Sequence, residues 1–370
     1  MNTADLNLDN RLDFRKSKGG FRELVPYDFD GVDFLTNDYL GLHSHFDSDL
    51  FSCFEPQSPE IGATGSRLIS GHHNVHDDLE VYLADFYRAP QALLYTSGYT
   101  ANIGLFQCLT TKDDLVFYDQ LSHASIREGL RLGLGKSMKF MHNNLVDLEQ
   151  KLARKSQDTK GLIYVVVESV YSMDGDVAPL SGLVDLCSRY GAHLIVDEAH
   201  GVGVFDPEGR GLVCSLGLED KVYARVVTFG KAIACHGAAI LGTETLKSYL
   251  INFSRSFIYT TGISIHDCRL IHFQHEQMRH GNQLARLREN IAYYQSIFEF
   301  ATSSAIQIIP RSSDLNSLQR LVVRLKDSGV HCKLVQSPTV PEGEERIRIC
   351  LHSFNTVEEL LLLKKEIENE

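Results

Sequence analysis

Residues 192–205 read AHLIVDEAHGVGVF, an apolar run that ends in an aspartate. The run is short and rich in branched side chains, which is typical of a buried strand. Asp197 follows it directly, and His200 stands three residues further on. In open α/β sheets, ligands bind just beyond the carboxyl ends of the strands. The stretch therefore predicts a strand that presents a carboxylate and an imidazole at a ligand-binding edge, although an aspartate at this position also commonly caps a turn.

More apolar runs of this kind lie on both sides of residues 192–205. They are ALLYTS (92–97), DLVFYD (114–119), GLIYVVVES (161–169) and ARVVTFG (224–230). Helical patterns separate them: YTANIGLFQCL (99–109), LVDLEQKLARK (145–155) and LSGLVDLCSRYG (180–191). Strands that alternate with helices predict an α/β domain with a mostly parallel central sheet.

The pattern changes after about residue 250. Residues 263–301 predict long helix with a break near Gly281. A mixed set of short strands and helices follows: AIQIIP (305–310), SLQRLVVRLKDSG (317–329), HCKLV (331–335), RIRICL (346–351) and TVEELLLLKKEIE (356–368). We therefore expect three parts: an N-terminal arm (1–35), a large α/β domain (36–255), and a linking helix with a small α+β C-terminal domain (256–370).

Composition excludes several classes of protein. The chain has 370 residues, 43% of them hydrophobic, and a net charge of −12, which disfavours nucleic acid as the main partner. Its eight cysteines are scattered with no C-x-x-C pair, so neither a disulfide framework nor a metal site is predicted. We expect reduced thiols in a cytoplasmic protein. The N-terminus lacks the apolar run of a signal peptide, and no stretch approaches the roughly 18 apolar residues of a membrane span.

A single lysine stands out in VVTFGKAIACHGAAI, residues 226–240. Lys231 follows an apolar run and precedes mostly small and apolar residues. Most lysines lie at the surface, and this one could stand at a strand–loop junction. A desolvated lysine amine, however, is activated for Schiff-base chemistry. This stretch alone leaves both interpretations open.

Three other strand ends offer polar groups. TSGYTANIGL (96–105) predicts a helix start, where free backbone N–H groups bind phosphate. DQLSHASI (119–126) offers His123, and VVVESVYSMDGDVAPL (165–180) offers Glu168 and Ser172. Each signal alone is more often structural. Together they describe a phosphate site, a partner for a charged ring nitrogen and an aldehyde-capturing lysine, which is the set expected for pyridoxal phosphate.

These motifs resemble the fold-type-I pyridoxal phosphate enzymes, and among them the α-oxoamine synthases. The similarity extends in order along nearly the whole chain. It rests on NDYLGL (37–42), GATGSRLISGHHNVHDDLE (62–80), SGYTAN (97–102), DQLSHAS (119–125), ESVYSMDGDVAPL (168–180), VDEAHGVGVF (196–205), TFGKAIACHGAA (228–239), FIYTT (257–261) and SPTVPEGEERIRICL (337–351). The resemblance implies the transferase fold of that family, with a mostly parallel sheet in the large domain and a small α+β C-terminal domain.

The resemblance also implies roles for the cofactor residues. Lys231 is the Schiff-base lysine, and Asp197 pairs with the pyridine nitrogen. His200 pairs with the phenolic oxygen, and His123 stacks on the ring and contacts substrate. Thr260 or Thr261 contacts the phosphate of the neighbouring subunit, because the family forms homodimers with shared active sites. Further cofactor contacts fall on Gly98, Tyr99, Ser172 and Thr228.

The implied reaction is a decarboxylative condensation of an amino acid with an acyl thioester, which makes the protein an acyltransferase. In the members most similar to this chain the substrates are L-alanine and a pimeloyl group on coenzyme A or acyl carrier protein. The implied substrate-binding residues are Arg22, Asn37, Thr339 and Arg348. The chain departs from the family pattern in three places: no proline soon follows Tyr259-Thr260-Thr261, Ala234 stands where glycine is common, and Asn355 replaces a histidine.

Several alternatives remain at this point. Other α-oxoamine synthases join glycine to acetyl-CoA or serine to a long acyl chain. A nucleotide-binding oxidoreductase would need G-x-G-x-x-G after an early strand, and the sequence has none. A non-catalytic scaffold would bind no cofactor.

The arm carries five cations between residues 11 and 22, which suggests either a solvated arm or a docking site for an acidic carrier.

Overall fold

A seven-stranded sheet forms the centre of the protein. The computed structural model describes residues 2–17, 21–24, 26, 30–44, 62–156, 159–309, 315–337 and 339–368. The strand order is β2-β8-β7-β6-β5-β3-β4. Its strands are β2 (Gln91–Tyr95), β3 (Leu115–Asp119), β4 (Lys136–Phe140), β5 (Ile163–Glu168), β6 (Ala192–Asp197), β7 (Ala224–Thr228) and β8 (Ala238–Gly242). Only β8 pairs antiparallel, with β2 and β7, so the predicted mostly parallel sheet is confirmed.

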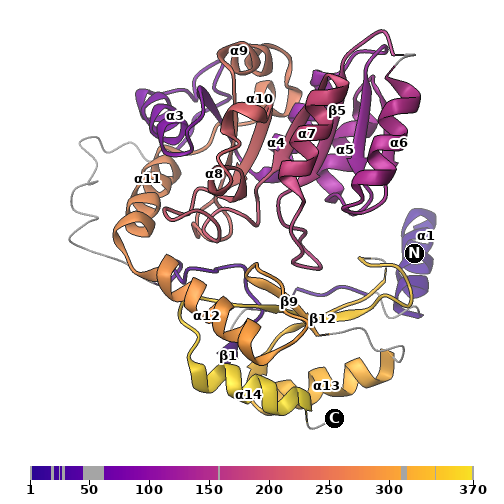
Figure 1. Ribbon diagram of the computed structural model, residues 1–370, viewed down its shortest axis with the longest axis vertical. Helices are drawn as coiled ribbons and strands as arrows, with labels where there is room; N and C mark the ends of the chain where they lie inside the picture. Colours follow the sequence, from indigo (N-terminus) through magenta and orange to yellow (C-terminus); the bar gives the residue numbers. More distant parts are fainter. Residues whose placement is uncertain are drawn as a thin grey trace.

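Helices cover both faces of this sheet (Figure 1). They are α3 (Asn74–Phe86), α4 (Gly98–Leu109), α5 (Ala124–Leu132), α6 (Leu145–Lys155), α7 (Leu180–Tyr190), α8 (Leu212–Ser215), α9 (Glu244–Phe253) and α10 (Arg255–Ile258). Successive strand residues enter opposite layers: Val166 packs with α4 and α5, whereas Val165 packs with α6 and α7. This two-residue period explains why the strands read as continuous apolar runs.

The C-terminal part lies beyond one edge of the sheet (Figure 1). Helices α11 (Ile265–His280) and α12 (Gln283–Ile297) lead into it, and the break predicted near Gly281 is confirmed. Strands β9 (Ile306–Ile309), β11 (Lys333–Val335) and β12 (Arg346–Cys350) form an antiparallel sheet. Helices α13 (Leu315–Asp327) and α14 (Val357–Glu368) accompany it. The domain limits 1–35, 36–255 and 256–370 stay a proposal.

The segment before the large sheet is tied to the C-terminal part. Strand β1 (Val32–Asp33) pairs in parallel with β10 (Val330–His331). The Cys350 amide donates to the Phe34 carbonyl at 2.9 Å. These bonds hold residues 36–42 between the two parts of the molecule.

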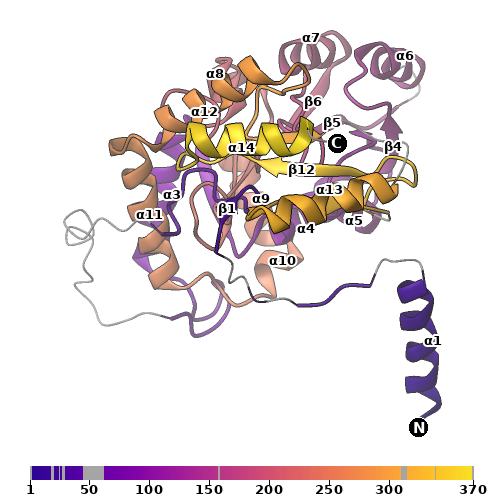
Figure 2. The ribbon, with the colours of Figure 1, turned by 90° about the horizontal axis from the view of Figure 1, so that it is seen from below.

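Some elements were not predicted. β4 has the mostly polar sequence KSMKF at the sheet edge, and β8 begins in small residues that resemble a loop. The arm folds as α1 (Thr3–Ser17), which projects from the body (Figure 2) but lines a pocket together with Gln336 and Glu345 of the C-terminal part. Acidic residues are interleaved with its basic ones, so docking of an acidic carrier stays a prediction.

The seven described cysteines carry free thiols, and no described helix is long and apolar enough to cross a membrane. Cys53 and the arm residue Lys18 lie outside the described residues.

Candidate active site

Three strand ends bring the predicted polar residues to one edge of the sheet. Glu168 ends β5, Asp197 ends β6 and Thr228 ends β7. These strands are parallel neighbours, and Glu168 and Asp197 are register partners. The carboxyl ends therefore meet where the α/β pattern predicts a ligand.

Asp197 is a buried carboxylate with fixed orientation. Asp197 is only 6% exposed. Asn102 Nδ2 donates to Oδ2 at 2.8 Å, and the Ala199 amide donates to Oδ1 at 2.9 Å. A carboxylate has about four acceptor positions, so two donors leave capacity for a third. Asp197 is thus suited to pair with a protonated ring nitrogen.

Lys231 lies beside His200. The Lys231 amine is 2.8 Å from His200 Nε2. Burial lowers the pKa of Lys231 to about 8, while the Asp197 and Glu168 carboxylates act in the opposite direction. Burial, with the charge of Lys231, also lowers the pKa of His200 well below its usual range. The lysine therefore has a substantial neutral fraction near pH 8, and a neutral amine is the nucleophile that captures an aldehyde.

A hydrogen-bonded chain leads from His200 to the predicted substrate residues. The Tyr39 hydroxyl is 2.7 Å from His200 Nδ1 and 3.3 Å from Asn37 Oδ1. Arg348 Nη2 donates to Asn37 Oδ1 at 2.8 Å, and its Nε donates to the Ser172 carbonyl at 2.7 Å. Arg348 thus presents a cation and Asn37 an amide at one place, a combination suited to a carboxylate.

His123 forms the N-cap of α5 and faces the same edge. Its amide donates to Glu168 Oε1 at 2.6 Å, and its Nδ1 lies 2.8 Å from Ser125 Oγ. Burial, together with the Asp197 charge, raises the pKa of Glu168 to about 8. Burial lowers the pKa of His123, so its ring is neutral near pH 7. A neutral imidazole held at its Nδ1 is a flat surface on which an aromatic ligand can stack.

The start of α4 supplies an anion site. Ser97 caps the helix, because its Oγ accepts from the Thr100 amide at 3.1 Å. A Cβ added to Gly98 would lie 3.4 Å from the Thr228 side chain, so the helix start and the end of β7 are in contact. The first amides of a helix have no intrahelical partner and favour phosphate. The Asn102 Oδ1 atom, farther along α4, is also buried without a partner among the described residues. The donor set therefore fits pyridoxal phosphate.

Comparison with known proteins agrees with this geometry. Residues 30–362 match the family described as aminotransferase class I and II. The chain belongs to this family. It is 38% identical to an 8-amino-7-oxononanoate synthase of Emericella nidulans, over 96% of this chain and 92% of that protein. A second 8-amino-7-oxononanoate synthase, from Methylobacillus flagellatus, is 36% identical over 89% of this chain and 84% of that protein.

Solved structures of two kinds share the aminotransferase fold of this chain. Serine palmitoyltransferase of Sphingomonas wittichii has a TM-score of 0.85 and 27% identity, covering 99% of this chain and 96% of that one. An 8-amino-7-oxononanoate synthase of Francisella tularensis has a TM-score of 0.74 and 26% identity, covering 92% of this chain and 97% of that one. The fold class predicted from the sequence and the resemblance to the α-oxoamine synthases are confirmed.

Four other predicted residues of this aminotransferase-family chain take no part in the hydrogen bonds described above. Arg22 is exposed, and Thr339 lies in an exposed turn whose amide donates to the Gln336 carbonyl at 2.9 Å. Thr260 and Thr261 line a narrow pocket with Arg67 and Thr96. In the part of the chain that the structure describes, no hydrogen bond joins these four residues to Lys231 or Asp197. Their roles stay predictions.

The sequence did not single out three contacts of the site. Tyr39, Asn102 and Ser125 all lie within stretches that carry the family resemblance, but only their three-dimensional partners give them roles. Ala234, one of the departures from the family pattern, has φ +52°, a left-handed conformation that glycine adopts readily. Asn355 accepts the His352 amide at 2.8 Å, so it secures the turn after β12.

Proposed function

We propose that the protein is a pyridoxal phosphate-dependent acyltransferase with the activity of 8-amino-7-oxononanoate synthases. It would condense L-alanine with pimeloyl-CoA or pimeloyl-acyl carrier protein, with loss of carbon dioxide, to give 8-amino-7-oxononanoate for biotin biosynthesis. The observation that supports this best is the Lys231 amine, held 2.8 Å from His200 in the loop after β7, the strand that pairs with the one ending in Asp197. The free thiols support a cytoplasmic location for the enzyme.

Each site residue would contact a different part of the cofactor. Asp197 would hold the ring nitrogen, His200 the phenolic oxygen and His123 one face of the ring. The start of α4 at Gly98, with Thr228, would hold the phosphate. Pyridoxal phosphate, once bound, supplies an electron sink for negative charge at the amino-acid Cα.

The chain itself supplies orientation and proton transfer. Arg348 and Asn37 would bind the amino-acid carboxylate, which orients the Cα–H bond towards the lysine. Lys231 would take the Cα proton, because an amine with a pKa of about 8 is an effective base near neutral pH. Burial of Asp197 and His200 limits the access of water to these groups.

The Lys231→Ala variant tests this proposal. We expect turnover to fall by about 10²–10⁴-fold, the usual contribution of a general base, measured as release of the free thiol from pimeloyl-CoA. Lys112→Ala, at an exposed lysine, is the matched control and should retain full turnover. Wild-type turnover in Lys231→Ala would refute the assignment.

A shared active site is the second part of the proposal. We infer a homodimer in which Thr260 or Thr261 reaches the phosphate of the partner. The highly exposed side chains of Tyr259, next to Thr260, and of Ile69 support it, because the turn that holds Ile69 is joined to this segment by the bond from the Gly262 amide to the Gly65 carbonyl. Lys231→Ala should be complemented by a Thr260→Val/Thr261→Val double variant when the two are mixed and subunits exchange. Restored turnover in the heterodimer supports shared sites, whereas an inactive heterodimer contradicts them.

Serine palmitoyltransferase activity is the second candidate, because those structures have the higher TM-scores. One screen separates the two: alanine, glycine and serine, each with pimeloyl, acetyl and palmitoyl thioesters. Preference for alanine with the pimeloyl thioester supports the proposed function. Preference for serine with the palmitoyl thioester assigns the second activity.

A further inference from the structure

A buried tyrosine contacts the histidine of the proposed cofactor site from behind. Tyr39 is fully buried, and its hydroxyl lies 2.7 Å from His200 Nδ1. The opposite ring nitrogen, Nε2, faces the Lys231 amine at 2.8 Å. A neutral imidazole has one N–H donor and one acceptor nitrogen. The bond at Nδ1 therefore determines what Nε2 presents to the site.

The geometry indicates the direction of the Tyr39 bond. The hydroxyl proton has two acceptors within reach, His200 Nδ1 at 2.7 Å and Asn37 Oδ1 at 3.3 Å. The amide oxygen of Asn37 already accepts from Arg348 at 2.8 Å. Burial raises the pKa of Tyr39, so the hydroxyl keeps its proton, and burial lowers the pKa of His200, so the ring is neutral. The shorter contact, to a neutral ring nitrogen, is the better bond for this proton.

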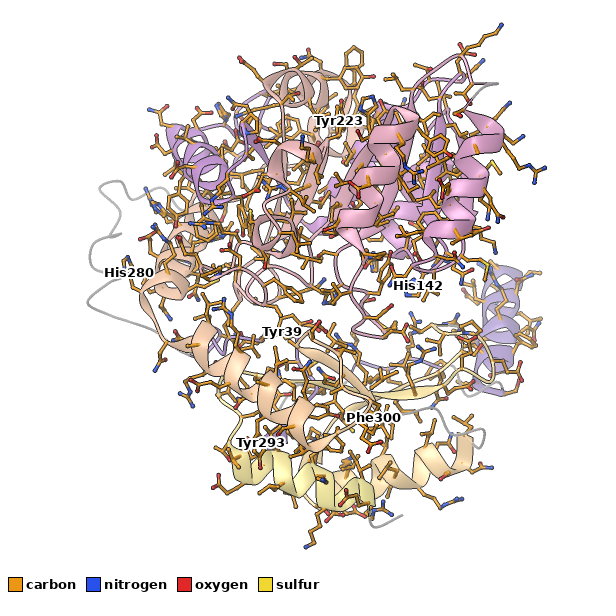
Figure 3. The ribbon with its side chains drawn as sticks, viewed as in Figure 1. Tyr39, His142, Tyr223, His280, Tyr293 and Phe300 are labelled. Atoms are coloured by element: carbon orange, nitrogen blue, oxygen red, sulfur yellow. The ribbon has the colours of Figure 1, made fainter. Side chains whose placement is uncertain are left out.

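The hydroxyl is also held in place by the backbone around it. The Ser353 amide donates to the Tyr39 carbonyl at 2.8 Å, and Ser353 Oγ donates to the Leu40 carbonyl at 2.7 Å. Figure 3 shows that Tyr39 lies between two parts of the molecule, the large sheet with its helices and the C-terminal part. The Tyr39–His200 bond therefore joins a segment fixed by the C-terminal part to the end of β6.

We propose that Tyr39 is a positioning residue that donates to His200 Nδ1 and thereby fixes the Nε2–H tautomer. His200 then offers an N–H donor to the neutral form of the Lys231 amine and to the phenolic oxygen of bound pyridoxal phosphate. The cofactor half of this inference rests on the proposed function. The tautomer half concerns the protein alone.

A second buried tyrosine in the same chain provides a matched control. Tyr87 is also fully buried, and its hydroxyl lies 2.9 Å from Nε2 of buried His275, which the proposed site does not include. Tyr39→Phe should weaken pyridoxal phosphate binding to the cofactor-free protein by about tenfold, the usual effect of one hydrogen bond. Tyr87→Phe should bind within about twofold of wild type. Unchanged binding in Tyr39→Phe, or equal weakening in both variants, would overturn the proposal.

Nitrogen-15 NMR of histidine-labelled, cofactor-free wild-type protein tests the tautomer directly. His200 signals are assigned by their loss in His200→Asn. At about pH 9, where the Lys231 amine is mostly neutral and can accept, we expect the proton on Nε2 in wild type and a mixture of tautomers in Tyr39→Phe. A proton on Nδ1 in wild type would overturn the proposal even if Tyr39→Phe failed to fold. A wild-type chain that bound no pyridoxal phosphate would instead refute the proposed function, and the tautomer would still decide this inference.

Discussion

Asn102 donates from Nδ2 to Asp197 Oδ2 across 2.8 Å, which joins the first turns of α4 to the end of β6. The same nitrogen lies 3.0 Å from Ser125 Oγ, and that hydroxyl lies 2.8 Å from His123 Nδ1. One buried amide therefore fixes the carboxylate proposed for the ring nitrogen and, through Ser125, the imidazole proposed for the ring face.

Asn102→Ala should weaken pyridoxal phosphate binding by about 10–100-fold, because a hydrogen bond to a charged group contributes about 1.5–3 kcal/mol. The measurement is an absorbance titration of the cofactor-free protein. Asn290→Ala is the control, since that amide donates at 2.8 Å and 2.9 Å to the His352 and Asn355 carbonyls instead. Equal weakening in both variants would show that Asn102 acts only through general packing.

Lys231 should react with acetic anhydride at a lower pH than ordinary lysines. Burial lowers its pKa to about 8, so its neutral, nucleophilic fraction should rise with a midpoint at about that pH rather than near the usual value of about 10.4. Mass spectrometry of the Lys231 peptide, at a series of pH values on cofactor-free protein, measures this midpoint. Exposed Lys112 provides the internal reference. A common midpoint for both lysines would contradict the prediction.

Much of the site was predictable because parallel strands place their carboxyl ends at one edge. Apolar runs that end in Asp197 and Glu168 therefore predict neighbours, and the register confirms that these two are paired. The sheet's unpredicted strands, β4 and β8, lack the signal of a branched apolar run. β4 carries the exposed Lys136 and Lys139 because it is an edge strand, and β8 starts in Ala238-Ala239, which are small although fully buried.

The residues that position the site side chains through hydrogen bonds were harder to predict than the site side chains themselves. Tyr39 lies 161 positions from His200, and Asn102 lies 95 positions from Asp197. Nothing in local sequence pattern reports such a pairing, since the partners meet only after the sheet and the C-terminal part have formed. Thr260 and Thr261 are a different case, because their proposed partner belongs to a second copy of the chain.

His142 should stabilise the protein more at low pH than at high pH. Its Nδ1 is 2.9 Å from Asp119 Oδ1, and its Nε2 contacts Asp176. Burial alone would lower the pKa of His142, but the hydrogen bonds to both carboxylates outweigh it and raise the pKa to about 9. Because the unfolded value is about 6.5, this stabilisation is complete below that pH and is lost as pH rises through about 9.

His142→Gln should therefore lower the free energy of unfolding by about 2 kcal/mol near pH 6 and by clearly less near pH 9.5, measured by urea denaturation of the cofactor-free protein. His280→Gln is the control, because the imidazole of His280, which lies at the outside of the molecule (Figure 3), is exposed in its pair with Glu276. It should change the free energy by less than about 1 kcal/mol at either pH. A pH-independent loss in His142→Gln would mean that packing, rather than its charge, stabilises the fold.

Glu80 should be the carboxylate whose removal destabilises the fold most among the ion pairs outside the site. Its side chain is 1% exposed and accepts from Arg67 Nη1 at 2.5 Å, from Lys247 Nζ at 2.7 Å and from the Leu94 amide at 2.9 Å. Glu80→Ala removes the carboxylate that pairs with both Arg67 and Lys247, and the Arg67 guanidinium is itself buried. The free energy of unfolding should therefore fall by about 3–5 kcal/mol. Glu149→Ala, which breaks an exposed pair with Arg189 at 2.7 Å, should cost less than about 1 kcal/mol. Urea denaturation of both variants measures the contrast, and equal losses would show that burial of the Glu80 cluster adds nothing to its stabilising effect.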